Sequence, residues 1–224
     1  MRLTKYTHAC VRLEKTADDG ATRRVLVIDP GSFSEVETAL NGADAFLVTH
    51  EHPDHIDLER TGAALEANTA LEAWAPEKTA GQLREAAPSA AERIHTTEPE
   101  AEFEAAGFSV RTFGSQHALI HASVPVVANI GYFIDGEVFH PGDSLTVPHG
   151  VEVPTLLVPI YAPWSKVGEV LDFLIAVRAR RAYPIHNAPL NEIGHGLVEA
   201  HAKRIGTLYG TEYAHLEPGE SVDL

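Results

Sequence analysis

Three histidines and an aspartate stand within six consecutive positions, at His50, His52, Asp54 and His55. Imidazole nitrogens and carboxylate oxygens are the donors that zinc and similar first-row metals prefer. Segment 44–48 before them reads as a short buried strand, so the chain is free to turn at His50. Extended backbone points His50 and His52 the same way, and a following turn can send Asp54 and His55 to a neighbouring point. One loop could therefore serve two adjacent metal sites, and a merely solvated histidine-rich turn would not need this spacing.

Three further donors, His117, Asp143 and His186, each come just past a predicted strand. Strand ends along one edge of a layered α/β domain are where ligands bind, so separate strands can bring these donors to the first cluster. The combined set exceeds the needs of one metal ion. It suits two ions about 3.5 to 4 Å apart, with a carboxylate and a hydroxide between them.

Two questions stay open from the sequence: whether His117 or His121 is the metal ligand, and whether His8 belongs to the site. His117 is favoured over His121 as a metal ligand because Gly114 places it directly past a strand end. His121 is the competing ligand and is assigned, with Asp54 and His8, to catalysis. Asp54 could pass on the proton that the leaving group needs. His8 is predicted to contact the substrate or a metal ligand, with a core-edge histidine as the alternative.

The remaining histidines and aromatic side chains receive less central positions. The rim of the site is predicted to include His140, His149 and His195, and the surface to include His95, His201 and His215. A loop after strand 155–158 holds Tyr161, Trp164 and Lys166, which could line a pocket or pack under a helix. Tyr132 is predicted to lie in the core.

The elements that must position these residues alternate between strands and helices. Strands are predicted at 3–6, 10–14, 25–28, 44–48 and 71–75, through 103–113, in a hairpin of 130–134 and 138–140, and at 155–158, 182–185 and 212–216. Helices are predicted at 58–67, 77–86, 167–179 and 192–205. This alternation favours one two-layered α/β domain over residues 1–224.

Composition narrows the classes of function. With 44% hydrophobic residues in 224, the chain can bury a core. Its net charge of -15 disfavours nucleic acid and anionic membranes as partners. The single cysteine, Cys10, excludes an internal disulfide or a cysteine-rich zinc cluster and suits a reducing compartment. No stretch resembles a signal peptide or a membrane span. We expect a cytoplasmic protein that acts on a small molecule, with its oligomeric state open.

The order of the candidate ligands resembles that of the metallo-β-lactamase fold superfamily. The resemblance rests on His50-x-His52-x-Asp54-His55, on His117, on Gly142-Asp143, on His186, and on Asp29 after strand 25–28 as the superfamily's first motif. It covers most of the chain. It implies an αββα sandwich, two mixed sheets flanked by helices, with a dimetal site at one edge of the sheets. Asp29 would then contact a ligand, and a plain turn aspartate is the alternative.

The resemblance also implies a division of the ligands. One metal ion would be held by His50, His52 and His117, the other by Asp54, His55 and His186, with Asp143 bridging. We expect two divalent ions, zinc first, with manganese or iron as alternatives. The segments 7–10, 129–132 and 140–143 are most similar to the ascorbate-phosphate lactonase-like branch. His52 favours hydrolysis, since the redox diiron branch usually has an acidic residue there.

The ligand set leads to a predicted reaction. A hydroxide held between two divalent ions can attack a carbonyl or phosphoryl centre, so no side-chain nucleophile is needed. The chain has no Gly-x-Ser-x-Gly elbow, no Ser-x-x-Lys and no phosphate-cradling glycine-rich loop. We therefore expect a dinuclear metal-dependent hydrolase of a small-molecule ester, lactone or phosphoester. The alternatives are a phosphodiesterase of the same fold and a non-catalytic metal-binding scaffold.

Overall fold

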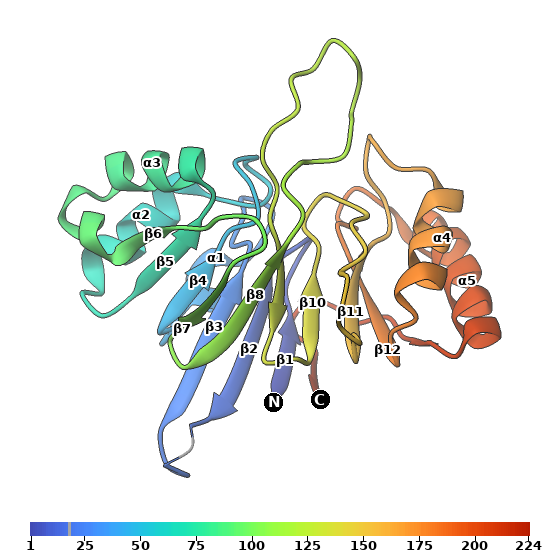
Figure 1. The fold of residues 1–224 in the computed structure, drawn as a ribbon, viewed down its shortest axis with the longest axis horizontal. Coiled ribbons are helices and arrows are strands. Elements are labelled where there is room, and N and C mark those ends of the chain that lie inside the picture. Colours follow the sequence, from blue (N-terminus) through green and yellow to red (C-terminus); the bar gives the residue numbers. More distant parts are fainter. Residues whose placement is uncertain (18) are drawn as a thin grey trace.

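Two β-sheets packed face to face form the centre of the molecule (Figure 1). The computed structural model describes residues 1–17 and 19–224. Over these residues, the first sheet runs in the order β14 (Ser221–Asp223), β1 (Arg2–Lys5), β2 (Val11–Thr16), β3 (Arg23–Ile28), β4 (Ala45–Leu47), β5 (Glu72–Ala75) and β6 (Ile94–Thr96). The second runs in the order β13 (Glu212–Tyr213), β12 (Arg181–Ile185), β11 (Thr155–Pro159), β10 (Val138–His140), β9 (Gly131–Ile134), β8 (Phe108–Phe113) and β7 (Glu102–Ala105).

Helices cover the outer face of each sheet (Figure 1). The first sheet carries α1 (Val36–Leu40), α2 (Leu58–Ala67), α3 (Glu77–Ala86) and a 3-10 helix, η1 (Pro88–Arg93); the second carries α4 (Val167–Val177) and α5 (Glu192–Tyr209). The side chains of Asp57 and Asn191 cap α2 and α5 by accepting hydrogen bonds from backbone N–H groups of the first turn. The predicted αββα sandwich is confirmed.

Apolar side chains fill three layers. The layer between the sheets includes Leu26, Leu157 and Tyr132, and further layers lie between each sheet and its helices. Burying a side chain of this size contributes about 1.5 to 3 kcal/mol. Tyr132 is fully buried, as predicted, and its hydroxyl donates to the Val48 carbonyl oxygen at 2.8 Å. This bond joins the second sheet to the segment that leads into His50.

Strand direction explains why distant residues meet at one edge. Within the first sheet β3, β4 and β5 are parallel, and within the second β10, β11 and β12 are parallel. Two antiparallel pairings, β8 with β9 and β9 with β10, give β8 the direction of β10. The carboxyl ends of these strands therefore lie along a common rim, and the loops leaving them carry the candidate ligands.

The predicted helices over 58–67 and 77–86 begin and end at those residues. Helix α5 extends beyond residue 205 to Tyr209, where Gly210 ends it in a left-handed conformation. The sequence did not indicate α1, β6 or β14. β14 lies in the polar tail after residue 216, where no strand was predicted because an edge strand with Ser and Asp has no hydrophobic alternation to reveal it. Among the described residues, no helix has the length and apolar character needed to cross a bilayer.

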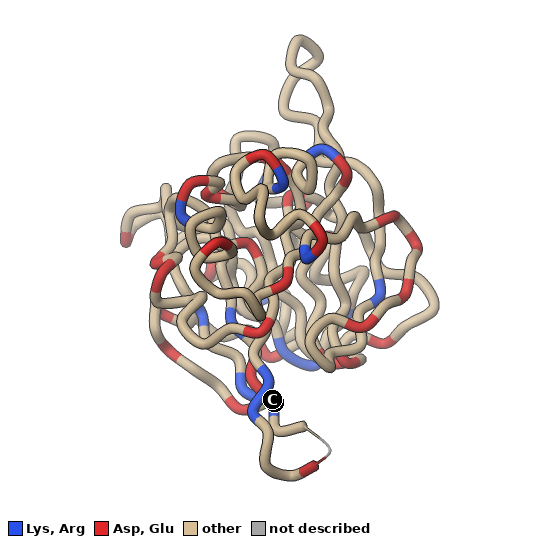
Figure 2. Tube along the Cα trace, turned by 90° about the vertical axis from the view of Figure 1, so that its left-hand side faces the viewer, with Lys and Arg blue, Asp and Glu red and all other residues tan. Residues whose placement is uncertain are grey.

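The loop between β8 and β9 projects beyond both layers (Figure 1). Segment 112–134, which includes this loop, has no Lys, Arg, Asp or Glu, and the projecting tip is uncharged in the side view of Figure 2. Several of its apolar side chains, including Leu119 and Val126, are exposed. The base of the loop is closed by the backbone N–H of His117, which donates to the Val127 carbonyl oxygen at 3.0 Å. His117 is therefore anchored at the root of a long arm.

Candidate metal centre

The loop that carries the histidine cluster lies against the chain that follows β3. A Cβ atom at Gly31 would stand 1.9 Å from the Asp54 carbonyl oxygen, so only glycine permits this approach. The backbone N–H of Ser32 donates to the Pro53 carbonyl oxygen at 2.8 Å and fixes the contact. The turn after His52 is thus held by the neighbouring loop of the same sheet.

One group of ligands consists of His50, His52 and His117. Each offers a ring nitrogen, and these nitrogens lie within 4.8 Å of one another. The Nε2 atom of His50 and the Nδ1 atom of His52 are 3.1 Å apart. His50 and His117 are buried, while His52 is half-buried at the rim. The loop after β4 and the arm after β8 thus converge on one point.

A second group consists of Asp54, His55 and His186, with His8 beside them. Their donor atoms also lie within 4.8 Å of one another. The Nε2 atom of His186 is 3.5 Å from Oδ2 of Asp54. His8 donates from Nε2 to the same Asp54 oxygen at 3.1 Å. His8 and His186 both have positive φ angles, 65° and 55°, a conformation that costs non-glycine residues about 1 to 3 kcal/mol and clusters at functional sites.

Asp143 stands between the two groups. Its Oδ1 atom is 3.0 Å from Nε2 of His55, and its Oδ2 atom is 3.2 Å from Nε2 of His117 and 3.0 Å from Nε2 of His186. One carboxylate therefore faces imidazoles of both groups. The three residues that the sequence placed after separate strands, His117, Asp143 and His186, do meet the histidine loop.

The donor atoms at this point lack hydrogen bonds of regular geometry. In the described part of the chain, Nε2 of His55, His117 and His186 and Oδ1 of Asp143 are buried and make no hydrogen bond of regular geometry, although these nitrogens lie 3.0 to 3.2 Å from the Asp143 carboxylate. Here several such atoms face a common centre, which is the arrangement that divalent cations would satisfy. The residues present fit a metal centre.

The opposite ring nitrogens of the same histidines are held by fixed partners. Nδ1 of His186 donates to the Tyr161 carbonyl oxygen at 2.6 Å, and Nδ1 of His117 to the Ala118 carbonyl oxygen at 2.5 Å. Nδ1 of His55 lies 2.6 Å from Oδ2 of Asp29. Such contacts fix the tautomer and aim Nε2 at the metal position.

Asp29 is fully buried and braces the ligand loop. Besides contacting His55, it accepts hydrogen bonds from the Thr49 backbone N–H at 2.7 Å and from the Thr49 hydroxyl at 2.8 Å. Of the two interpretations of this residue, the geometry therefore favours support of a ligand over a plain turn aspartate. Its φ of 52° marks another constrained backbone position at the site.

The charges of the site without metal follow from burial and proximity. Burial holds the pKa of His50 well below its ordinary value and lowers that of His8 to about 4. Burial also opposes a charge on His186, but the carboxylates of Asp143 and Asp54 raise its pKa to about 9. The pKa of His55 is raised well above its ordinary value: burial opposes this, and Asp143 and Asp29 outweigh it. Protons on His55 and His186 thus supply positive charge where cations would bind.

The two aspartates remain ionised. Burial would raise the pKa of Asp143, but the nearby imidazoles, His55 foremost, hold it well below the ordinary range. Burial likewise opposes ionisation of Asp54, and contacts with His186 and His8 hold its pKa low. Both carboxylates are therefore available as anionic donors near neutral pH.

His121 does not join either ligand group among the described residues. It lies exposed on the arm, where its Nδ1 atom is 2.7 Å from the Ser123 hydroxyl. His117, nearer the strand end, is the residue that the fold brings to Asp143. A position four residues further along a projecting loop points away from the rim, so the structure offers no contact that supports the catalytic assignment of His121.

Of the other residues predicted to lie at the rim or in the pocket, some lie near the metal centre and others are exposed away from it. His140 is buried behind the site and donates to the Ala9 carbonyl oxygen at 2.9 Å, whereas His149 is exposed beside Glu100. Of the predicted pocket residues, Trp164 donates from Nε1 to Oδ2 of Asp143 at 2.9 Å. Lys166 is exposed and pairs with Glu169.

Sequence reasoning missed some supporting residues. The side-chain oxygen of Asn129 accepts the Asp143 backbone N–H at 2.9 Å, and a Cβ atom at Gly142 would stand 2.3 Å from that oxygen. The spacing of Asn129 from Gly142-Asp143 does not reveal this contact, because it depends on the pairing of β9 with β10. His215, predicted to lie on the surface, lines a pocket together with His195.

The sequence was compared with known families and proteins. The family model described as "Beta-lactamase superfamily domain" matches residues 2–186. This chain belongs to that superfamily. Protein Rv0786c of Mycobacterium tuberculosis is 42% identical to this chain over 84% of the length of each. UPF0173 protein PF0020 of Pyrococcus furiosus is 30% identical over 86% of each chain. The predicted family, including its ascorbate-phosphate lactonase-like branch, is confirmed.

A solved structure agrees on the fold of this superfamily member. It is similar to Igni18, a metallo hydrolase from the archaeon Ignicoccus hospitalis, with a TM-score of 0.71 and 18% sequence identity, over 99% of this chain and 97% of that one. At this identity the likeness concerns the arrangement of strands and helices. The matched region of the family model includes all the candidate ligands, from His50 to His186.

Proposed function

We propose that this chain is a dinuclear metal-dependent hydrolase that cleaves a small-molecule ester, lactone or phosphoester. The observation that carries the proposal is the set of buried, unpartnered donor atoms on His55, His117, His186 and Asp143 that face one another. An inert scaffold would have no need to keep these atoms apart from hydrogen bonds. Membership in the superfamily supports the same reading.

The donor chemistry supports zinc as the first choice, with manganese or iron as alternatives. His50, His52 and His117 would hold one ion, Asp54, His55 and His186 the other, and Asp143 would contact both. Five imidazoles and two carboxylates, without a thiolate, suit such ions. When bound, they would supply an acidified water and would polarise the substrate oxygen that gains charge.

The chain's own residues orient this centre and handle protons. Asp29, the Tyr161 carbonyl oxygen and the Ala118 carbonyl oxygen hold the ring orientation of the ligands. Asp54 is partly exposed and bonded to His8, so it is placed to pass a proton from the attacking water to the leaving group. His8, which burial keeps neutral, keeps Asp54 aligned for that transfer.

The surroundings of the site support a small, uncharged substrate group over a nucleic acid. The arm after β8 carries no charged residue, and Trp164 presents an indole beside Asp143. The protein as a whole carries a net charge of -15, which repels a phosphate backbone at long range. This balance favours a lactone or simple ester ahead of a polymeric phosphodiester.

The experiment that tests the proposal begins with elemental analysis of the purified protein. We expect about two metal ions per chain to remain at the candidate metal centre after dialysis against metal-free buffer. Chelation should abolish hydrolysis and readdition should restore it in a screen of lactones, thioesters and phosphodiesters with zinc, manganese and iron. Turnover of the phosphodiesters alone would favour the phosphodiesterase alternative. Silence across every metal form and substrate class would favour a metal-binding scaffold.

A further inference from the structure

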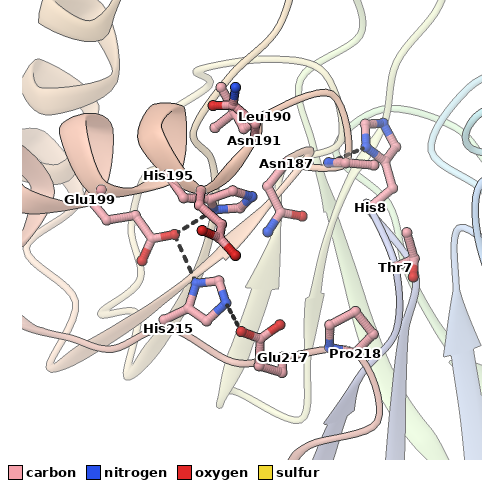
Figure 3. A pocket seen from close by; sticks show the side chains of 13 residues that line it. Thr7, His8, Asn187, Leu190, Asn191, His195, Glu199, His215, Glu217 and Pro218 are labelled. Atoms are coloured by element: carbon pink, nitrogen blue, oxygen red, sulfur yellow. Dashed lines mark hydrogen bonds and ion pairs between the residues drawn. The ribbon is translucent and has the colours of Figure 1, made fainter.

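A second cluster of histidines and carboxylates lies apart from the candidate metal centre, in a pocket of about 720 Å³ between α5 and the chain after β13 (Figure 3). His195 and Glu199 stand one turn apart on the same face of α5. His215 faces them from the opposite wall. The three donor atoms lie within 4.8 Å of one another. We propose that His195, Glu199 and His215 form an additional divalent-cation site, selective for zinc-like ions.

The contacts within the cluster converge on one oxygen. Nδ1 of His195 is 2.9 Å and Nδ1 of His215 is 2.8 Å from the same Oε1 atom of Glu199. Tetrahedral coordination with bonds of about 2.0 to 2.1 Å separates ligand atoms by roughly 3.3 Å. To become two Nδ1 ligands and one carboxylate ligand, the two N–H···O contacts would each have to open by about half an ångström. Each ring that binds through Nδ1 keeps one proton, on Nε2: a neutral ring moves its Nδ1 proton there by exchange with solvent, and a doubly protonated ring releases one proton to solvent.

The far side of His215 supports a ligand function. Its Nε2 atom lies 3.4 Å from Oε1 of Glu217, and Figure 3 shows this pair on the side away from Glu199. A carboxylate that accepts the Nε2 proton leaves Nδ1 with a free electron pair, as in many carboxylate–histidine–metal arrangements. The chain thus supplies both the ligand and the group that would orient it.

The charge and openness of the pocket select the kind of ligand. Its described lining includes the carboxylates of Glu192, Glu199 and Glu217 and contains no Lys or Arg. The field therefore favours a cation over an anionic substrate group. The side chains of His195 and His215 are 24% and 32% exposed, so water could complete the coordination shell.

The position of the cluster gives such an ion a structural consequence. His195 and Glu199 belong to a helix on the second sheet, while His215 precedes the crossing to β14, which pairs with β1 in the first sheet. A cation held by all three residues would connect the segment between His215 and β14 to α5. His8 lines the same pocket and also contacts Asp54, so the proposed cation site lies beside the candidate metal centre.

The test compares zinc content after dialysis against micromolar free zinc for wild type, His195→Ala, His215→Ala and a size-preserving Glu199→Gln. The control is His201→Ala, which removes an exposed histidine from the same helix. We expect each cluster variant to hold one zinc fewer than wild type and the control to match wild type. This difference does not depend on how many ions the other centre holds. Equal zinc contents in all the proteins would overturn the proposal.

A second measurement on unmodified protein avoids any effect of the substitutions on folding. Long-range ¹H–¹⁵N spectra report each ring nitrogen of a histidine. On zinc addition we expect the Nδ1 resonances of His195 and His215 to shift while Nε2 of His215 remains protonated. Unchanged imidazole signals at micromolar zinc would show that the cluster is a proton-occupied network only, and the proposal would fail.

Discussion

Two clusters of imidazoles and carboxylates lie in this molecule, and they differ in how their donor atoms are satisfied. At the rim of the sheets, Nε2 atoms of His55, His117 and His186 are buried without hydrogen bonds of regular geometry. In the pocket beside α5, the Nδ1 atoms of His195 and His215 contact Glu199 and remain partly exposed. In the first cluster, protons on His55 and His186 hold buried positions that cations would take, whereas in the second a proton and a cation compete for nitrogens that are partly exposed to water.

The difference also concerns the supporting residues. The rim cluster is braced by fully buried Asp29, by Thr49 and by backbone carbonyl groups. In the pocket cluster, the outer contact of His215 is the exposed Glu217 at 3.4 Å. Rigid support is what preorganised reaction centres require. We therefore expect chemistry at the rim and reversible ion binding in the pocket.

The largest effect is expected for Asp143→Ala, which removes the carboxylate that faces both ligand groups. Hydrolysis should fall by at least about 1,000-fold, equal to about 4 kcal/mol in transition-state stabilisation. The circular dichroism spectrum should stay native, because Asp143 lies in a loop beyond β10. Asp172→Ala removes an exposed acid from α4 and serves as the control. A fully active Asp143→Ala protein would refute the rim as the reaction centre.

Lys5 gives a test at a buried residue next to His8. Its Nζ donates to the carbonyl oxygens of Tyr6 and His8, but desolvation by burial opposes the ammonium charge and lowers the pKa from 10.5 to about 8. Between pH 8 and 10.5 the unfolded chain holds a proton that the native chain lacks. This group therefore makes the free energy of unfolding rise with pH across that window, by up to about 3 kcal/mol.

The check is urea unfolding of wild type, Lys5→Met and Lys203→Met at several pH values. We expect the rise across the window to disappear in Lys5→Met, which has no titrating group there, and to persist in Lys203→Met, since Lys203 is exposed. Parallel curves for wild type and Lys5→Met would mean that the Lys5 ammonium is not destabilised by burial.

Asp29→Asn tests whether the brace of the rim cluster matters as much as its geometry indicates. An amide keeps the shape but removes the charge that faces His55 and the Thr49 hydroxyl. Loss of such outer partners typically costs 10- to 100-fold in metal affinity or activity, or about 1.4 to 2.7 kcal/mol. Metal affinity should be measured alongside kcat/KM. An unchanged metal affinity in Asp29→Asn would mean that Asp29 is only a turn residue.

The smallest effect is expected for His121→Ala, on the exposed arm. Its kcat/KM should stay within about twofold of wild type, since surface substitutions away from a site are usually near neutral. His117→Ala, which removes a ligand-group member from the root of the same arm, should lower kcat/KM at least about 100-fold. A stronger loss in His121→Ala than in His117→Ala would reverse the ligand assignment.

Much of the fold was predictable because the periodicity of the chain agrees with its final structure. Helices α2 and α3 have polar caps or breakers at both ends, and their bounds were found from sequence. The hairpin of β9 and β10 was indicated by Asp135-Gly136, which adopt positive φ angles in the turn. In contrast, β14 depends on pairing with β1, more than 200 positions away in the chain, and has no local pattern of its own.

The site was predictable in its donors and less so in its support. His50, His117, Asp143 and His186 follow strand ends, and strand direction brings such ends to one rim. The contact from Trp164 to Asp143 depends on the path of an irregular loop. His215 was predicted to lie on the surface, because nothing in the local sequence links it to another donor. Its proximity to His195 arises only from the packing of α5 on the second sheet.

The arm after β8 separates two tasks that enzymes often combine in one segment. At its root, pairing of His117 with Val127 and of the Ala118 N–H with the Asp143 carbonyl oxygen at 2.9 Å locks the ligand in place. Beyond these two hydrogen bonds, residues 119–126 are exposed to solvent. Exposed loop tips tolerate insertion and replacement. Changes within the tip can therefore leave the position of the histidine at its base unaltered.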